Sequence, residues 1–131
     1  MSRRELREQI FKLLFRVEFN RMEDMPEQEQ LFFEDEHAAK EEDAVYVSDK
    51  FRKISEKLSE IDSQLNERTQ GWDTTRMSKV DLTILRLGVY EICYDEDVPT
   101  GVAINEAVEL AKKFGQDASP GFVNGILAKF A

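Results

Sequence analysis

Cysteine, glycine, proline and histidine are all scarce in this sequence of 131 residues. The single cysteine, Cys93, excludes an internal disulfide, and six glycines and three prolines favour helices over a turn-rich β architecture. A chain of this length buries roughly two thirds of its unfolded surface, so its stability requires neither a disulfide nor a metal. We predict that Cys93 packs as a small hydrophobe in a reducing cytoplasm.

Long hydrophobic runs are missing too. None approaches the roughly 18 residues that a membrane span requires. The charged start, MSRRELREQ, has no apolar segment of signal-peptide type behind it. We therefore expect a cytoplasmic protein with no membrane partner.

The usual sequence patterns of catalytic and metal sites are absent as well. There is no cluster of cysteine and histidine with ligand spacing, no phosphate-binding glycine loop and no serine nucleophile elbow. His37 is the only histidine, and a lone histidine in an acidic stretch is usually a surface residue. We expect no catalytic residue, no metal and no cofactor, so the chain is not predicted to be an enzyme.

Charge is abundant but unevenly distributed. The formal net charge is −9, which at first argues against a nucleic-acid partner. Residues 1–21, however, carry six basic and three acidic side chains, whereas residues 22–49 carry eleven acidic side chains and one lysine. The basic end can contact a polyanion while the acidic segment limits indiscriminate binding.

Hydrophobic periodicity predicts an all-α fold. Apolar residues recur at helical spacing over 3–20, 44–68 and 79–94, with room for a break inside the second range. A short helix is expected after Pro26. We predict a single compact domain, 1–131, of about six or seven helices arranged as two small packed helical bundles, with subdomains roughly at 1–70 and 71–131.

The segment 79–94 and the last third of the chain give the sharpest local predictions. Residues 79–94 are apolar on nearly all sides, which is typical of the buried centre of a bundle, and Gly88 lets a neighbouring helix approach closely. In the last third, Gly115 is expected to stop one helix. Ser119 and Pro120 are expected to start the next, as a capping hydroxyl and a proline at the first helical position.

Three arginines near the start form the first candidate site. Arg3, Arg4 and Arg7 lie three or four residues apart, so they share one face of a helix. Guanidinium groups donate hydrogen bonds in a planar fork that suits phosphate. The alternative is an ordinary solvated helix start, although basic residues there oppose the helix dipole and are slightly unfavourable for folding.

Phe122 and Asn124 form the second candidate site. Phe122 lies in the first turn of the last helix beside polar residues, where its ring can stack on a base. The alternative is that the ring joins the core. The stripe of Val123, Ile126 and Phe130 is already complete without it, so the pattern alone leaves both readings open.

Three other residues have structural and functional readings. Asp81, three residues after Ser78, is either a capping partner or a contact residue. Arg86 is a lone charge in an apolar helix and needs a carboxylate partner or a rim position. Phe15 is more often a core residue than a contact.

The segment DVPTGVAINEAVELAKKFG, followed by FVNGIL, resembles the C-terminal signature of the NusB family of bacterial transcription antitermination proteins. The start, SRRELREQIFKLLF, is similar to the arginine-bearing first helix of that family, and VDLTILRLGVYEI resembles its central helix. The resemblance covers the start and the last half closely and the middle by helix pattern.

The resemblance implies a helical RNA-binding adaptor. Members bind the boxA element of nascent ribosomal RNA leader transcripts together with NusE, a ribosomal small-subunit protein. The pair promotes read-through by RNA polymerase with other antitermination factors. Carried over to this chain, the RNA-binding residues are Arg3, Arg4, Arg7, Phe122 and Asn124, and we also predict that Arg86 binds RNA. The partner-binding residues are Phe15, Asp81 and Leu85.

The chain also departs from the family pattern. Glu5 interrupts the arginines where some relatives carry a base, and Phe15 stands where tyrosine is common. We expect the arginines and Phe122 to form one binding surface for single-stranded RNA. The rival reading is a helical protein-interaction module or homodimer that never touches RNA, which the net acidity favours. An RNA methyltransferase with a similar domain is disfavoured by the short chain and the missing glycine-rich loop.

Overall fold

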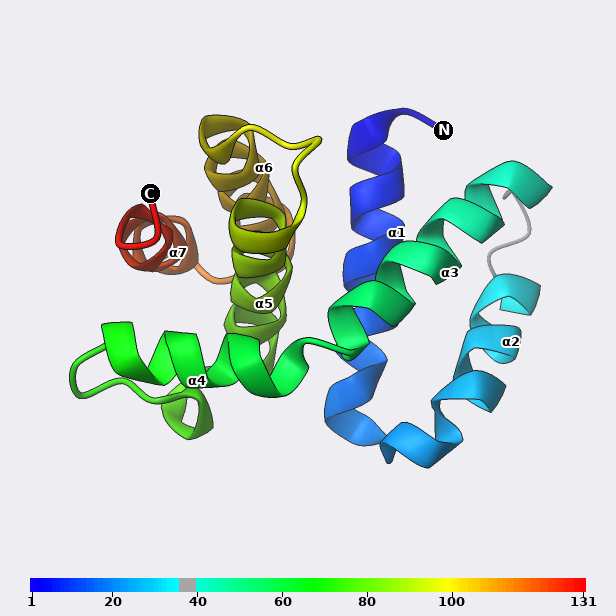
Figure 1. Ribbon diagram of the computed structural model, residues 1–131, viewed down its shortest axis with the longest axis horizontal. Helices are drawn as coiled ribbons and strands as arrows, with labels where there is room; N and C mark the ends of the chain where they lie inside the picture. The colour runs from blue at the N-terminus through cyan, green and yellow to red at the C-terminus, as the bar shows by residue number, and fades with distance from the viewer. Residues whose placement is uncertain (36–39) are drawn as a thin grey trace. The chain divides into compact units, whose positions relative to one another are not determined.

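The computed structural model describes residues 1–35 and 40–131, and His37 lies outside them. Over the described residues the chain consists of seven α-helices and three short 3₁₀ segments, without a β-strand (Figure 1). The predicted all-α class is confirmed. The helices divide into two compact units, Met1–Ser55 and Glu56–Ala131. This division lies earlier than the expected boundary near residue 70, because the helix at 58–68 contacts the central helix of the second unit.

The N-terminal unit is built on two contacting helices, α1 and α3. Its elements in chain order are α1 (Arg3–Phe15), η1 (Arg16–Phe19), η2 (Met22–Asp24), α2 (Met25–Asp35) and α3 (Glu41–Ser55). The core of this unit consists of Ile10, Phe11, Leu13, Leu14, Met25, Phe32, Val47, Phe51 and Ile54. The expected helix at 3–20 is therefore shorter, since the backbone tightens into a 3₁₀ turn at Arg16 and becomes extended at Asn20.

The C-terminal unit surrounds one buried helix, α5. Its elements are α4 (Leu58–Arg68), η3 (Thr74–Arg76), α5 (Lys79–Tyr94), α6 (Thr100–Phe114) and α7 (Ser119–Ala128). The helix α5 contacts α4, α6 and α7, and it is buried without interruption from Leu82 to Glu91 (Figure 1). The expected helix at 79–94 is confirmed, and the range 44–68, for which a break was left open, divides into α3 and α4.

Two glycines of this unit are required by close packing. A Cβ atom on Gly88 would lie 2.7 Å from Leu127 Cδ1, so the predicted close approach of a neighbouring helix is confirmed. A Cβ atom on Gly115 would lie 2.6 Å from the Ser119 side chain and 2.8 Å from the Ala111 carbonyl oxygen. Gly115 follows the last residue of α6, as predicted, although its φ of −93° is open to any residue.

Two local predictions were wrong. Ser119 does not cap α7, whose N-cap is Ala118; its buried hydroxyl instead accepts a hydrogen bond from Gln116 N–H at 3.0 Å. The hydroxyl thus closes the loop before the helix. Cys93 is exposed and not packed in the core, and its thiol donates to Gln64 Oε1 at 3.7 Å.

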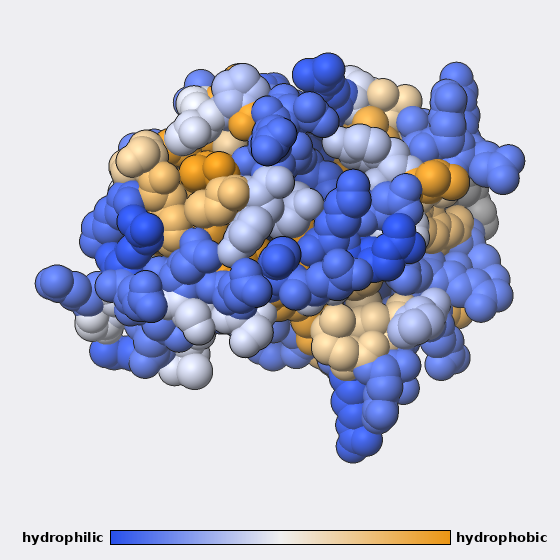
Figure 2. All heavy atoms as spheres, in the orientation of Figure 1, coloured by the Kyte–Doolittle hydropathy of each residue, from blue (hydrophilic) through white to orange (hydrophobic). Residues whose placement is uncertain are grey.

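The surface is strongly polar. On the face drawn in Figure 2, hydrophilic residues cover most of the area and apolar residues form separate patches. Within residues 1–35 and 40–131, no helix combines the length and the apolar character that crossing a bilayer requires.

Candidate RNA and partner interface

The N-terminal arginines lie in the first two turns of α1. Ser2 Oγ accepts from Glu5 N–H at 3.1 Å, and Glu5 Oε1 accepts from Ser2 N–H at 3.1 Å, which is a complete capping box. Glu5, which interrupts the arginines, is therefore a structural residue of the helix start. Its carboxylate also offsets the unfavourable interaction of the arginines with the helix dipole.

The three arginines differ in exposure. Arg3 and Arg4 are exposed, whereas Arg7 is only 8% exposed and lies where α1 enters the core. The expected shared face thus offers two accessible guanidinium groups, and the third is held inside. Arg3 and Arg4 are the residues of this site that a polyanion can reach without a rearrangement.

Phe15 is the middle ring of an aromatic row on α1 and η1. Its ring stacks on Phe11 with centroids 6.0 Å apart and meets Phe19 edge-on at 5.1 Å. Phe11 is buried, Phe15 is half-buried and Phe19 is 60% exposed. Sequence reasoning missed Phe19 as a surface residue, although its i, i+4 spacing from Phe15 was visible as a signal.

Phe122 lies on α7 and its ring meets Trp72. The two ring centroids are 6.0 Å apart and the planes are inclined by 71°, an edge-to-face arrangement. Phe122 is half-buried, and Asn124, two residues further along α7, is exposed. The ring of Phe122 is therefore neither sealed in the core nor fully exposed, and the sequence analysis did not predict its contact with Trp72.

Trp72 is the second ring of this site and is held by a rigid turn. Gly71 has a φ of +80°, a left-handed conformation that favours glycine. Trp72 N–H donates to the Thr69 carbonyl at 3.1 Å, and the buried Thr69 hydroxyl donates to the Trp72 carbonyl at 2.6 Å. The Arg76 guanidinium lies over the Trp72 ring, 5.4 Å from its centroid, and donates to the Gly71 carbonyl at 2.9 Å.

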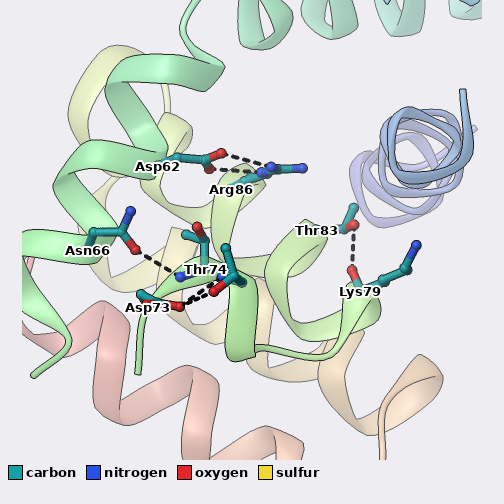
Figure 3. A network of polar contacts seen from close by, with 8 residues as sticks. Asp62, Asn66, Asp73, Thr74, Lys79, Thr83 and Arg86 are labelled. Atoms are coloured by element: carbon teal, nitrogen blue, oxygen red, sulfur yellow. Dashed lines mark hydrogen bonds and ion pairs between the residues drawn. The ribbon is translucent and has the colours of Figure 1, made fainter. Parts of the chain in front are cut away.

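Asp73 caps the 3₁₀ segment that follows Trp72. Its carboxylate accepts from the Thr75 hydroxyl and, at 3.1 Å, from the Thr75 N–H. The hydroxyl is the largest cause that holds the pKa of Asp73 below its ordinary value of 3.8. Asn66 Oδ1 accepts from Thr74 N–H at 2.8 Å, which ties the same segment to α4 (Figure 3).

Arg86 has a carboxylate partner. Its Nε and Nη2 donate to Asp62 Oδ1 and Oδ2 at 2.9 Å and 2.8 Å, and the two side chains point toward one another between α5 and α4 (Figure 3). Of the two alternatives predicted for Arg86, a carboxylate partner or a rim position, this bidentate pair is the first. The guanidinium fork is already bound, and its side chain is only 10% exposed, so the expected RNA-binding role is not supported by the geometry.

The other two candidate residues on α5, Leu85 and Asp81, lie in different environments. Leu85 is completely buried, so it offers no surface for a partner and we correct its expected role to that of a core residue. Asp81 N–H donates to Ser78 Oγ at 3.1 Å, which is half of a capping box. Asp81 Oδ1 is buried and, among the described residues, has no hydrogen-bond donor.

In the described part of the chain, no three His, Cys, Asp or Glu side chains gather in a way that could hold a metal ion. The chemistry that the arrangement offers is cationic and aromatic. Arg3 and Arg4 lie in one unit, and Phe122, Trp72 and Arg76 in the other.

Comparison with known proteins decides the family. The model of the NusB family matches residues 4–131 of this chain. The chain belongs to the NusB family. The transcription antitermination protein NusB of Agathobacter rectalis is 50% identical over 131 residues, which is all of both chains.

Solved structures of the family have the same fold. The structure of T. maritima NusB is 38% identical, with a TM-score of 0.88 over 100% of this chain and 91% of that one. A crystal structure of the antitermination factors NusB and NusE in complex with dsRNA contains a chain that is 25% identical. Its TM-score is 0.85, over 98% of this chain and 94% of that one. The expected family membership is confirmed, and the relatives are antitermination factors.

Proposed function

We propose that this chain is an RNA-binding adaptor in transcription antitermination. Together with NusE it binds the boxA element of nascent ribosomal RNA leader transcripts and promotes read-through by RNA polymerase. The observation that carries the proposal is the full-length likeness to a NusB chain solved with NusE and dsRNA. We expect this activity in the cytoplasm, where the nascent RNA is transcribed. The other antitermination factors make the contact with polymerase.

The RNA contacts that we propose are cationic at one site and aromatic at the other. Exposed Arg3 and Arg4 bind phosphates through their planar forks. Phe122 stacks on an unpaired base and exposed Asn124 offers an amide to a base edge or phosphate. Arg7 and Arg86 are left with structural roles because their side chains are buried or already paired.

The partner contacts that we propose use residues left unsatisfied by the chain itself. The half-buried ring of Phe15 continues into exposed Phe19, so a partner side chain that covers this row buries aromatic surface. Asp81 Oδ1 is buried and lacks a donor among the described residues, so a donor from NusE would pair with this carboxylate once the half-buried side chain turns outward. Phe15 carries no hydroxyl, so its contact is apolar.

The test compares two pairs of arginine substitutions in the N-terminal unit. Arg3→Ala with Arg4→Ala removes the proposed phosphate contacts. Arg21→Ala with Arg52→Ala removes the same charge from exposed positions elsewhere. Binding of boxA-like RNA is measured with and without NusE between low and physiological salt.

The first pair should weaken binding and reduce the slope of log affinity against log salt by about 0.7 for each lost phosphate contact, whereas the control pair should leave the slope near that of the parent. Equal slopes for both pairs would contradict the arginine role. Absence of RNA binding by the parent protein with NusE, in single or double strands, would support a protein-interaction module or homodimer instead, and the mass in solution would identify the latter.

A further inference from the structure

The exposure of Trp72 is not explained by folding. Trp72 remains 52% exposed after its contacts with Phe122 and Arg76 have formed. A tryptophan usually buries most of its large apolar surface, and an open one on a rigid support is typical of a recognition surface. Within the C-terminal unit it is joined by Val102 alone among the exposed large hydrophobic residues that the structure describes.

The backbone that carries the Trp72 ring is held by contacts within the chain. The turn at Gly71 and the two hydrogen bonds with Thr69 fix its backbone, and Arg76 holds one carbonyl of that turn. A rigid platform loses little conformational entropy on binding, so more of the stacking energy contributes to affinity.

The segment that carries Trp72 is also tied to the helix that carries Phe122. Arg68, at the end of α4, donates to the Lys129 carbonyl at 2.9 Å, and Lys129 Nζ donates to the Arg68 carbonyl at 3.1 Å. The Arg68 guanidinium lies 4.7 Å from the centroid of the Phe130 ring. These contacts join the end of α4, just before the Trp72 turn, to the end of α7.

We propose that Trp72 and Phe122 together form a two-ring platform on which one RNA strand lays two unstacked bases, while Arg76 supports the Trp72 turn from one side. This inference rests on the proposed function and extends its RNA site to Trp72. A stacked base lies parallel to its ring, and the two rings are inclined by 71°. Neighbouring bases of a duplex are nearly parallel, so the platform accepts single-stranded RNA and rejects duplex RNA.

Trp72 is the only tryptophan of the chain, so its fluorescence reports on this platform directly. A boxA-like single-stranded RNA is titrated into the full-length protein with NusE, and the emission of a Trp72→Phe complex is subtracted as the blank. We expect quenching that saturates with RNA binding measured by gel shift. The duplex of the same sequence should leave the emission unchanged, even where the arginines bind it.

Affinity supplies the second measurement. Trp72→Leu should weaken single-strand binding roughly 5- to 150-fold, the effect of losing one stacked base, while Trp72→Phe should stay near the parent protein. Melting curves of both variants establish that they are folded. Arg3→Ala with Arg4→Ala should lower affinity yet keep the full quenching at saturating RNA, which separates the platform from the arginine site.

The outcomes distinguish this inference from the proposed function. If RNA binds but the Trp72 emission is unchanged, or if Trp72→Leu binds like the parent, the platform is wrong and the proposed function stands. Equal quenching by the duplex would overturn the selection for unstacked bases. If the parent protein with NusE binds no RNA at all, the proposed function fails and the platform fails with it.

Discussion

The two units of this chain use their hydrophobic residues differently. In the C-terminal unit α5 is buried along most of its length and three helices cover it. Among the described residues of the N-terminal unit, six large apolar side chains remain 38% to 60% exposed, namely Met1, Phe19, Met22, Leu31, Val45 and Tyr46. The C-terminal unit thus encloses its central helix and leaves only Trp72 and Val102 as exposed large apolar residues among those described, whereas the N-terminal unit leaves more of its apolar surface open to solvent.

The difference should also appear in how each unit responds to the loss of a contact. The neighbours of an enclosed residue relax only partly into the gap that its loss leaves, whereas water replaces a lost surface contact. Substitutions of the same chemistry should therefore cost more free energy of unfolding in the C-terminal unit. Matched pairs of variants, one in each environment, test this expected difference in free energy of unfolding.

The largest effect is expected at the Arg86–Asp62 pair. Asp62→Ala leaves the nearly buried Arg86 guanidinium without its bidentate carboxylate, and the expected loss is about 3 kcal/mol in free energy of unfolding. Asp49→Ala breaks a similar ion pair with Arg52 in the N-terminal unit, but both side chains there are largely exposed, so the loss should stay below about 1 kcal/mol.

Denaturant unfolding measures both variants of this comparison. The double variant Asp62→Leu with Arg86→Met should recover most of the lost stability, because an apolar pair needs no counter-charge. Similar losses for Asp62→Ala and Asp49→Ala would show that the burial of an ion pair does not determine how much free energy of unfolding its loss costs.

The helix α5 and its contacts also show which features can be predicted from the sequence and which cannot. The bounds of α5 follow from local signals, because Ser78 supplies a cap and the apolar pattern lasts until the acidic residues after Tyr94. The contact partners of Arg86 and Phe122, by contrast, cannot be predicted from local sequence signals. Asp62 is 24 residues before Arg86, and pairing over such a distance depends on how α4 packs against α5.

Local ambiguity explains the other errors. Ser119 has backbone N–H groups available on both sides, and the sequence does not say which one its hydroxyl will bind; the structure selects Gln116. The helical spacing of Arg3 and Arg7 predicts a shared face correctly, but it does not reveal where along that face the core begins. Periodicity thus predicts elements and faces, whereas packing depth decides which members of a face are available for binding.

The next effect in size is expected at Gly88. Alanine there would place its Cβ 2.7 Å from Cδ1 of Leu127, which is itself completely buried, so the Leu127 side chain would have to shift within the core. Overpacking of this kind should cost about 2 kcal/mol and lower the melting temperature. Gly101→Ala, in α6 with open space around it, is the matched control and should be neutral or stabilising. A neutral Gly88→Ala would mean that α5 and α7 separate easily.

A smaller effect is expected at the capping box of α1. Ser2→Ala removes the hydroxyl that accepts from Glu5 N–H and should cost about 1 kcal/mol, while Ser2→Thr keeps the acceptor and should cost less. Hydrogen exchange of the amides in the first turn of α1 measures the local effect. Because Arg3 and Arg4 lie in this turn, fraying should also weaken RNA binding. Equal exchange in the alanine and threonine variants would exclude a role for the cap.

The smallest effect concerns the carboxyl group of Asp73, beside Trp72. Its pKa is held below the ordinary value chiefly by the Thr75 hydroxyl, so Thr75→Ala should raise this pKa and Thr75→Ser should leave it low. The sign follows from linkage: a depressed pKa stabilises the fold above the unfolded value, and this contribution is lost as pH falls through the folded value. A carboxyl NMR titration of the three proteins measures the shift. An unchanged pKa in Thr75→Ala would mean that the backbone N–H bonds alone hold the turn, and the platform around Trp72 would then not depend on this hydroxyl.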